Sequence, residues 1–148
     1  MGPRRDPSTL RQFAAALRPG AVLHLHQPLA GKQKFHVLIA AASECSLGFI
    51  INSRPSPFIQ RRPELLCRQV AMLLAVHPFM QHDSVIACHE AVKLPPRDEL
   101  IDRLIEGSAE HIGHVHQTLF GSIAQAAAGS STIAERDATL IVRAFAPS

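Results

Sequence analysis

The sequence predicts an α+β protein, in which a small antiparallel β-barrel or curled sheet precedes a set of helices. Strand-like segments fill residues 20–94, whereas residues 97–145 carry apolar residues at helical spacing. Strands first and helices afterwards is an order typical of the α+β class. We expect a single domain across residues 1–148, with an N-terminal helix over 1–18, the sheet over 20–94 and a helical extension over 97–145.

The composition is that of a globular protein with one buried core. The chain has 148 residues, of which 47% are hydrophobic and 18% are charged. No apolar run reaches the roughly 18 residues that a membrane span requires, and the basic N-terminus lacks the apolar stretch of a signal peptide. The three cysteines, Cys45, Cys67 and Cys88, form an odd, widely spaced set that disfavours a disulfide framework. We therefore expect a cytoplasmic protein that does not bind a membrane.

Charge is distributed unevenly along the chain. Between Arg18 and Arg68 there are seven basic and two acidic residues, and between Asp98 and Asp137 there are seven acidic and two basic residues. A basic half that carries the strands suits a polyanionic partner such as a nucleic acid, although charge runs are also common on solvated faces.

The first helix and the first strand have clear local signals. Asp6-Pro7 is suited to begin a helix, and an apolar stripe follows at Leu10, Phe13, Ala14 and Leu17. Arg18-Pro19-Gly20 ends this helix. Residues 21–27 then alternate, which predicts a strand with Leu23 and Leu25 on one face and His24 and His26 on the other.

Two further strands follow, at residues 32–41 and 47–53. Each has a solid apolar centre and polar ends, and residues 42–46 form a connection of turn length. Residues 64–76 fit either a helix or a strand, and we favour a strand over 68–75. Residues 83–92 are the last predicted strand.

Three helices are predicted in the C-terminal half. The first begins at Asp98 and ends at Gly107. The third begins with a capping box formed by Thr132 and Glu135. Between them, the second has one apolar stripe made of Ile112, Val115, Leu119, Ile123 and Ala127.

Four segments resemble the MazF/PemK-like toxins of type II toxin–antitoxin modules, and a PemK-like subgroup in particular. Together they cover roughly residues 18–94. They are an opening strand, a basic turn into a hydrophobic strand, a strand that ends in Ile-Asn-Ser, and a late strand preceded by His-Pro-Phe: Arg18-Pro19-Gly20-Ala21-Val22, Lys32–Ile39, Gly48–Ser53 and His77–Cys88.

The resemblance implies an SH3-like barrel that forms a homodimer and acts as a metal-independent endoribonuclease. It also implies that a cognate antitoxin protein restrains the activity, that single-stranded RNA is the substrate and that no cofactor is needed. Family members carry an Arg-Pro pair at the basic turn, where the Arg assists cleavage, whereas this sequence has Lys34-Phe35. They also use a Ser or Thr on a following strand, for which Ser53 and Ser84 are the candidates here.

RNA cleavage through the 2′-hydroxyl needs a base, an acid and a cation for the charge that develops on phosphorus. Lys34 and His36 lie two residues apart on a predicted strand, so they project from the same face. We expect Lys34, His36 and Ser53 to be catalytic, with His36 as the acid or base because imidazole titrates near neutral pH. The alternative is that Lys34 and His36 are solvated residues at the start of a strand.

Further polar residues are candidates for binding RNA. Asn52 and Ser84 can hydrogen-bond a base edge or a phosphate, although both residue types are also common where strands begin and end. Arg54 can grip a phosphate through two hydrogen bonds. The expected RNA contacts are Lys32, Asn52, Arg54, Arg61, Arg62 and Ser84.

Two other functions remain open. A non-catalytic SH3-like barrel that binds nucleic acid or a protein partner would also explain the missing Arg-Pro pair. The nine histidines raise the option of a metal-dependent hydrolase, with His111 and His114 three apart on the predicted helix. No HExxH or CxxC spacing occurs, so we expect no metal site.

Overall fold

A computed structural model confirms the α+β class. It describes residues 6–27 and 32–146, and for residues 26, 27, 32 and 33 it describes the backbone but not the side chains. The side chain of Lys32, one of the predicted RNA contacts, therefore lies outside the described part.

The described chain contains seven strands and six helices. The strands are β1 (Ala21–Gln27), β2 (Lys32–Ala40), β3 (Ser46–Asn52), β4 (Gln69–Met72), β5 (Ser84–Ala87), β6 (Val92–Leu94) and β7 (Ala109–His114). The helices are α1 (Pro7–Ala16), α2 (Pro57–Gln60), α3 (Pro63–Leu66), α4 (Arg97–Glu106), α5 (Phe120–Ala128) and α6 (Glu135–Ala144), with a 3-10 turn, η2 (Gln117–Leu119), before α5.

The strands form one antiparallel sheet, in the order β4-β5-β3-β2-β1-β7. β3 pairs with β2 through residues 47–51 on one side, and on the other side it pairs first with β6 and then with β5. In the described residues β4 and β7 form the two ends of the sheet and do not pair with each other. The sheet is therefore open, and the expected SH3-like barrel is not confirmed.

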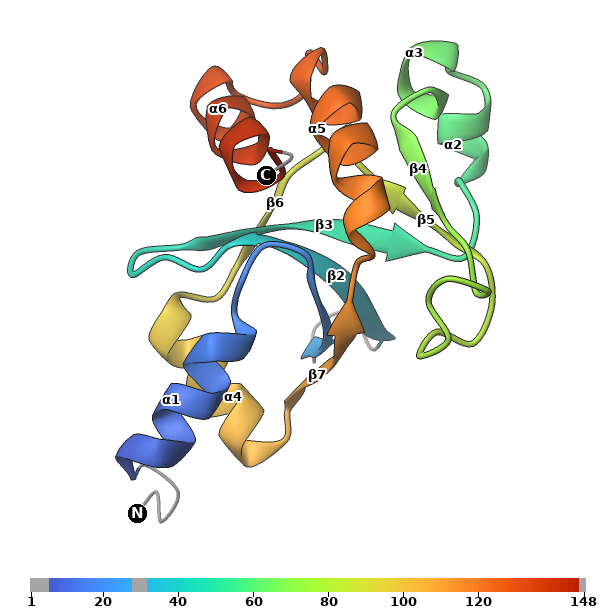
Figure 1. The fold of residues 1–148 in the computed structure, drawn as a ribbon. Helices are drawn as coiled ribbons and strands as arrows, with labels where there is room; N and C mark the ends of the chain where they lie inside the picture. Colours follow the sequence, from blue (N-terminus) through green and yellow to red (C-terminus); the bar gives the residue numbers. More distant parts are fainter. Residues whose placement is uncertain (1–5, 28–31, 147–148) are drawn as a thin grey trace.

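Each face of the sheet has its own hydrophobic core, because α5 and α6 cover one face and α1 and α4 cover the other (Figure 1). Alternating residues of β2 serve the two cores: Val37 and Ile39 pack toward α5 and α6, and Leu38 packs toward α1 and α4. The continuous apolar centre of this strand follows from burial on both faces.

The ends of two helices are built as the sequence predicts. The Asp6 carboxylate accepts a hydrogen bond from the backbone N–H of Thr9 at 2.9 Å and so caps α1. α4 ends at Gly107, whose φ of +90° lies in the left-handed region that favours glycine. The predicted strand over 68–75 is confirmed for residues 69–72, which form β4.

The prediction of a helix beginning at Ile112 is wrong, because residues 109–114 form strand β7. β7 pairs with the free side of β1, with Ala21 opposite His114 and Leu25 opposite Ala109. Helical spacing of apolar residues arose here by chance across a strand, a 3-10 turn and α5. Backbone pairing with a distant strand is a tertiary effect that local spacing does not reveal.

Two smaller predictions also need correction. The strand predicted over 83–92 is two strands, β5 and β6, separated by residues 88–91. The predicted capping box at Thr132 does not form, since α6 begins at Glu135 with Ala134 at its N-cap and no side-chain capping bond. The Thr132 hydroxyl instead donates to the carbonyl of His89, as does that of Ser130.

The Phe79 ring packs closely against Gly113 of β7, and this contact gives a stability prediction. A Cβ atom at Gly113 would lie 2.5 Å from the Phe79 ring, so Gly113→Ala should lower the free energy of unfolding by about 1–3 kcal/mol. Gly121→Ala is the matched control, because nothing lies within 4 Å of that Cβ position and alanine favours the helix. Urea denaturation of both variants is the measurement, and equal effects would contradict the packing argument.

Candidate functional site

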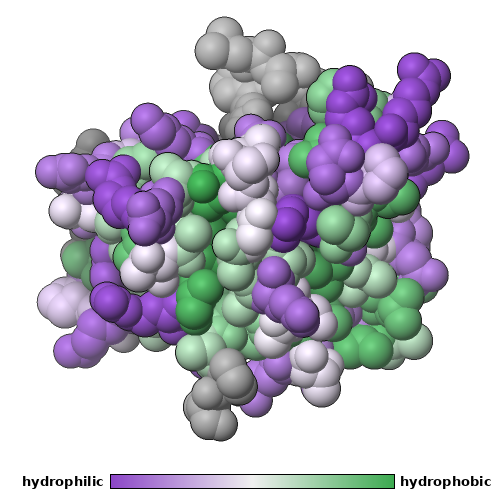
Figure 2. Space-filling view, turned by 90° about the horizontal axis from the view of Figure 1, so that it is seen from above, coloured by the Kyte–Doolittle hydropathy of each residue, from purple (hydrophilic) through white to green (hydrophobic). Residues whose placement is uncertain are grey.

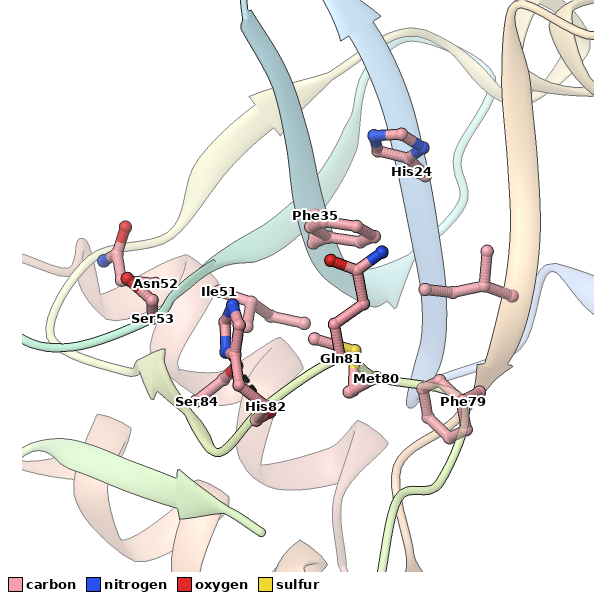
Figure 3. A pocket seen from close by; sticks show the side chains of 11 residues that line it. His24, Phe35, Ile51, Asn52, Ser53, Phe79, Met80, Gln81, His82 and Ser84 are labelled. Carbon is pink, nitrogen blue, oxygen red and sulfur yellow. Dashed lines mark hydrogen bonds between the residues drawn. The ribbon is translucent and has the colours of Figure 1, made fainter. Parts of the chain in front are cut away.

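The strand ends and the loop before β5 enclose a pocket of about 380 Å³. The loop, residues 73–83, connects β4 to β5 and is called the β4–β5 loop below. Strands β1, β2, β3 and β7 supply the other walls. The lining residues are His24, Phe35, Ile51, Asn52, Ser53, Phe79, Met80, Gln81, His82, Ser84 and Ile112 (Figure 3).

Two stacked rings form one wall of the pocket. His24 and Phe35 are direct cross-strand partners on β1 and β2. Their ring centroids are 4.4 Å apart and the ring planes differ by 11°. A flat, partly buried stack of this kind offers an apolar surface on which another planar ring can lie.

Polar side chains gather at one end of the pocket. Figure 3 shows Asn52, Ser53, His82 and Ser84 at this end and Phe79 at the opposite end. Three of these residues, Asn52, Ser53 and Ser84, were predicted site residues. The structure brings them together from the end of β3 and the start of β5, which are adjacent strands.

His82 stands where it can exchange a proton with a ligand. Its Nδ1 atom lies 2.9 Å from the Asp83 carbonyl oxygen and 3.3 Å from the Ser84 hydroxyl. The carbonyl is only an acceptor, so this contact favours the tautomer with the proton on Nδ1. Nε2 is then a free acceptor on an exposed side chain. The predicted strand begins at Asp83, so His82 was not among the predicted site residues; the His-Asp-Ser run was the available signal.

Lys34 and His36 lie on the other face of the sheet, away from this pocket. Continuing the pairing of Phe35 with Ile51 by one residue places Lys34 opposite Asn52, and both line a second, smaller pocket of about 180 Å³. Asn52 therefore borders both pockets. The predicted catalytic trio is not assembled, because Ser53 lines the larger pocket and Lys34 the smaller one.

His36 is a core residue with an altered titration. Its side chain is 2% exposed, and its Nδ1 atom has no hydrogen-bond partner among the described residues. Burial lowers the pKa of His36 from 6.5 to about 4; a hydrogen bond with the Lys34 backbone opposes this shift and the positive charge of Lys34 adds to it. The expectation that His36 titrates near neutral pH is wrong, and its imidazole is neutral there.

The predicted arginine contacts lie outside the lining of the larger pocket. Arg54 follows Ser53 directly and is exposed. Arg62 lies over the Phe58 ring at 3.6 Å and donates to the Phe58 carbonyl at 2.9 Å, and Arg61 beside it is exposed. Positive charge thus surrounds the strand ends, but no Lys or Arg in the described chain lines the larger pocket itself.

The histidines do not assemble a metal site in the described part of the chain, where no three His, Cys, Asp or Glu side chains lie close enough to hold an ion. His111 and His114 lie on strand β7 rather than on a helix. A bulge in the pairing with β1 places them opposite Leu23 and Ala21, which share one face of that strand. His114 is engaged through Nδ1 with the Val115 carbonyl at 3.0 Å.

Several large apolar side chains are exposed on the surface. Phe58 is 57% exposed and Leu73 is 49% exposed. Seen from above, the surface mixes hydrophilic and hydrophobic side chains, with hydrophobic areas across its middle (Figure 2). The others are Leu66, Leu74, Val76, Leu140 and Val142.

No known family model matches the chain, and a search of curated proteins finds no match. Among the helices of residues 6–27 and 32–146, none has the length and apolar character needed to cross a membrane.

Burial of His36 gives a prediction for the effect of pH on stability. Because its pKa is lower in the folded protein, the unfolded chain binds an extra proton between pH 6.5 and about 4. The stability that neutral, buried His36 contributes is therefore fully present above pH 6.5 and is lost as the pH falls toward 4. Between pH 7.5 and 4.5 the free energy of unfolding should fall by about 2–3 kcal/mol from this residue.

The measurement is urea denaturation of the wild type and of His36→Leu across this pH range. His89 and His111, whose pKa values burial also lowers, stay in both proteins, so the difference between the two curves isolates His36. The wild type should lose stability more steeply toward acid. Parallel curves would show that His36 does not titrate differently on folding.

Proposed function

We propose that this chain is a metal-independent endoribonuclease that cleaves single-stranded RNA at the larger pocket, as the toxin of a type II toxin–antitoxin module. The observation that carries the proposal is the meeting of Asn52, Ser53 and Ser84 with His82 at one end of a pocket walled by stacked rings. The resemblance of residues 18–94 to MazF/PemK-like toxins supports the same chemistry.

The proposed reaction is an attack of a ribose 2′-hydroxyl on the adjacent phosphorus. Nε2 of His82 takes the 2′-hydroxyl proton, since Nδ1 is held at the Asp83 carbonyl. The new O–P bond forms as the bond to the 5′-oxygen breaks, and that oxygen takes a proton from water. The products carry a 2′,3′-cyclic phosphate and a 5′-hydroxyl.

Neutral donors at the same end suit the developing charge. The Asn52 amide and the Ser53 hydroxyl border the pocket and can donate hydrogen bonds to the non-bridging phosphate oxygens. Arg54, next along the chain, is an exposed cation that can reach toward a bound phosphate. Lys34 lies across the sheet beside Asn52 and adds positive charge from the other side.

The stacked wall suits an unpaired base. Bases of single-stranded nucleic acids stack on aromatic side chains, an interaction worth about 1–3 kcal/mol per base. The His24/Phe35 pair is the aromatic surface within this pocket, and the Gln81 amide beside it can hydrogen-bond a base edge. Base-paired RNA would not present such a face.

The remaining parts of the proposal rest on the resemblance. They are an SH3-like core for the strands, a homodimer, restraint by a cognate antitoxin and a cytoplasmic location. Phe58, Leu66, Leu73, Leu74 and Val76 are apolar and exposed, and such side chains are available for contact with a protein partner.

One observation favours a second candidate, a protein that binds RNA without cleaving it. The family's Arg-Pro pair is replaced by Lys34-Phe35, and within the described chain no Lys or Arg lines the pocket that holds His82. A site with a base but a distant cation would bind a nucleotide and leave the phosphate uncleaved.

Incubation of the purified protein with short labelled single-stranded RNA in EDTA tests the proposal. We expect fragments with 2′,3′-cyclic phosphate ends, identified by mass spectrometry. His82→Ala should slow cleavage about 100-fold or more, since a general base contributes on the order of 10²–10⁴. Ser53→Ala should slow it less, because one neutral hydrogen bond is lost.

The matched control is His111→Ala, an exposed histidine on β7 that does not line this pocket. It should cleave at the wild-type rate. Binding of RNA without any cleavage by the wild type would favour the second candidate, and absence of both binding and cleavage would overturn both.

A further inference from the structure

The β4–β5 loop supplies a large part of the pocket wall, namely Phe79, Met80, Gln81 and His82. The loop is closed on itself by short-range hydrogen bonds. Leu74 N–H donates to the Asp83 carboxylate at 2.8 Å, and Met80 N–H donates to the His77 carbonyl at 3.0 Å. These bonds shape the loop but do not attach it to the rest of the protein.

The His77 side chain adds a hydrogen-bonded attachment to the apolar packing of Met80 and Phe79 against the core. It is 1% exposed, and its Nε2 atom accepts a hydrogen bond from the backbone N–H of His116 at 3.0 Å. Its Nδ1 atom lies 3.0 Å from the Leu73 carbonyl oxygen. His116 lies just beyond β7, so the ring joins the loop to the opposite end of the sheet.

Only one form of the imidazole satisfies both contacts. The His116 N–H is a donor, so Nε2 carries no proton, and the Leu73 carbonyl is an acceptor, so Nδ1 carries one. The ring is therefore neutral with a defined tautomer. A second proton on Nε2 would place two donors against each other in a buried setting, which is costly.

Packing around His77 links this bond to the pocket. The His77 ring meets the Phe79 ring edge to face, with centroids 5.8 Å apart. The Phe79 ring in turn packs against Gly113 of β7 so closely that no Cβ fits there. Moving His77 would therefore move Phe79, which is the apolar end of the pocket.

We infer that His77 is a positioning residue, which docks the β4–β5 loop on the β7 end of the sheet in its neutral form and releases the loop when protonated. The inference rests on the proposed function, in which this pocket binds RNA. Titratable groups on the two packed elements are His82 and Asp83 on the loop, Glu110, His111 and His114 on β7, and His116 just beyond β7. The His82 ring contacts the Asp83 carbonyl, and the Asp83 carboxylate accepts from Leu74 N–H. The His114 ring contacts the Val115 carbonyl, and the His116 ring contacts the Thr118 hydroxyl.

Two variants separate attachment from titration. His77→Gln keeps an acceptor for the His116 N–H but cannot gain a proton in mild acid. His77→Leu keeps apolar bulk and loses both hydrogen bonds. His36 and the other histidines stay unchanged in both variants, so general effects of pH on stability and on RNA attraction are shared.

Amide hydrogen exchange, followed by mass spectrometry at pH 7.5 and 5.0, measures whether the loop is docked. The rates are corrected for the intrinsic effect of pH on exchange. In the wild type, amides of the β4–β5 loop should exchange at least tenfold faster at pH 5.0, while those of β2 and β3 stay protected. His77→Gln should show the same loop protection at both pH values. His77→Leu should show fast loop exchange at both. Equal loop protection in all three proteins at both pH values overturns the inference.

Affinity for a labelled single-stranded RNA, measured on the same samples, reads the pocket. Relative to His77→Gln, the wild type should lose about tenfold in affinity between pH 7.5 and 5.0, and His77→Leu should bind about tenfold more weakly than the wild type at pH 7.5. Loop release without any change in affinity overturns the positioning role. If the loop responds but no variant binds RNA at either pH, the proposed function fails and the docking by His77 stands. Should His77→Leu not fold, the wild type and His77→Gln still give the decisive pH comparison.

Discussion

The rest of the structure depends on the backbone hydrogen bonding of β3. This strand pairs with β2 on one side and with both β6 and β5 on the other. The pairing brings two later strands, β5 and β6, onto the hairpin of β2 and β3. Gly48 lies between these strands, and a Cβ there would lie 2.7 Å from a Leu94 side-chain methyl group and 3.0 Å from the Val37 carbonyl oxygen. Without β3 in this position, neither core nor pocket would be enclosed.

The polar end of β3 explains why a site forms where it does. Along the strand, Phe49 and Ile51 bury themselves under α5 and α6, and the pattern then stops at Asn52-Ser53. There the strand leaves the core, and β5 and the β4–β5 loop bring Ser84 and His82 beside it. Polar side chains that would be solvated at most strand ends here line one end of the larger pocket. Function on a rigid sheet edge with a loop as its wall is a common arrangement.

Much of the fold could be predicted because its signals are local. The Asp6 cap, the Gly107 stop and the apolar centres of β2 and β3 each act within a few residues. β7 could not be predicted, since six residues with mixed polarity become a strand only because β1 offers an unpaired edge. The openness of the sheet is likewise set by the pairing of distant segments.

The site was predicted in part, for a related reason. Asn52, Ser53 and Ser84 mark strand ends, which are visible in the sequence, and they do meet. His36 is a polar residue of the kind usually found on a surface. Here helices cover both faces of the sheet, so its side chain is buried whichever face it points to. His77 and His82 lie in a stretch that reads as a simple turn, and their contacts with Leu73, His116 and Asp83 depend on how that turn folds back.

Asn52 borders the larger pocket on one face of the sheet and the smaller one, with Lys34, on the other. Its single amide group can orient toward one side at a time. An anion beside Lys34 and a nucleotide in the larger pocket would therefore compete for the same donor. Such competition is negative thermodynamic coupling, and it acts equally in both directions: each ligand weakens the other by the same factor. Binding on one face of the sheet would then be transmitted to the other face through this one side chain, without any change in the backbone.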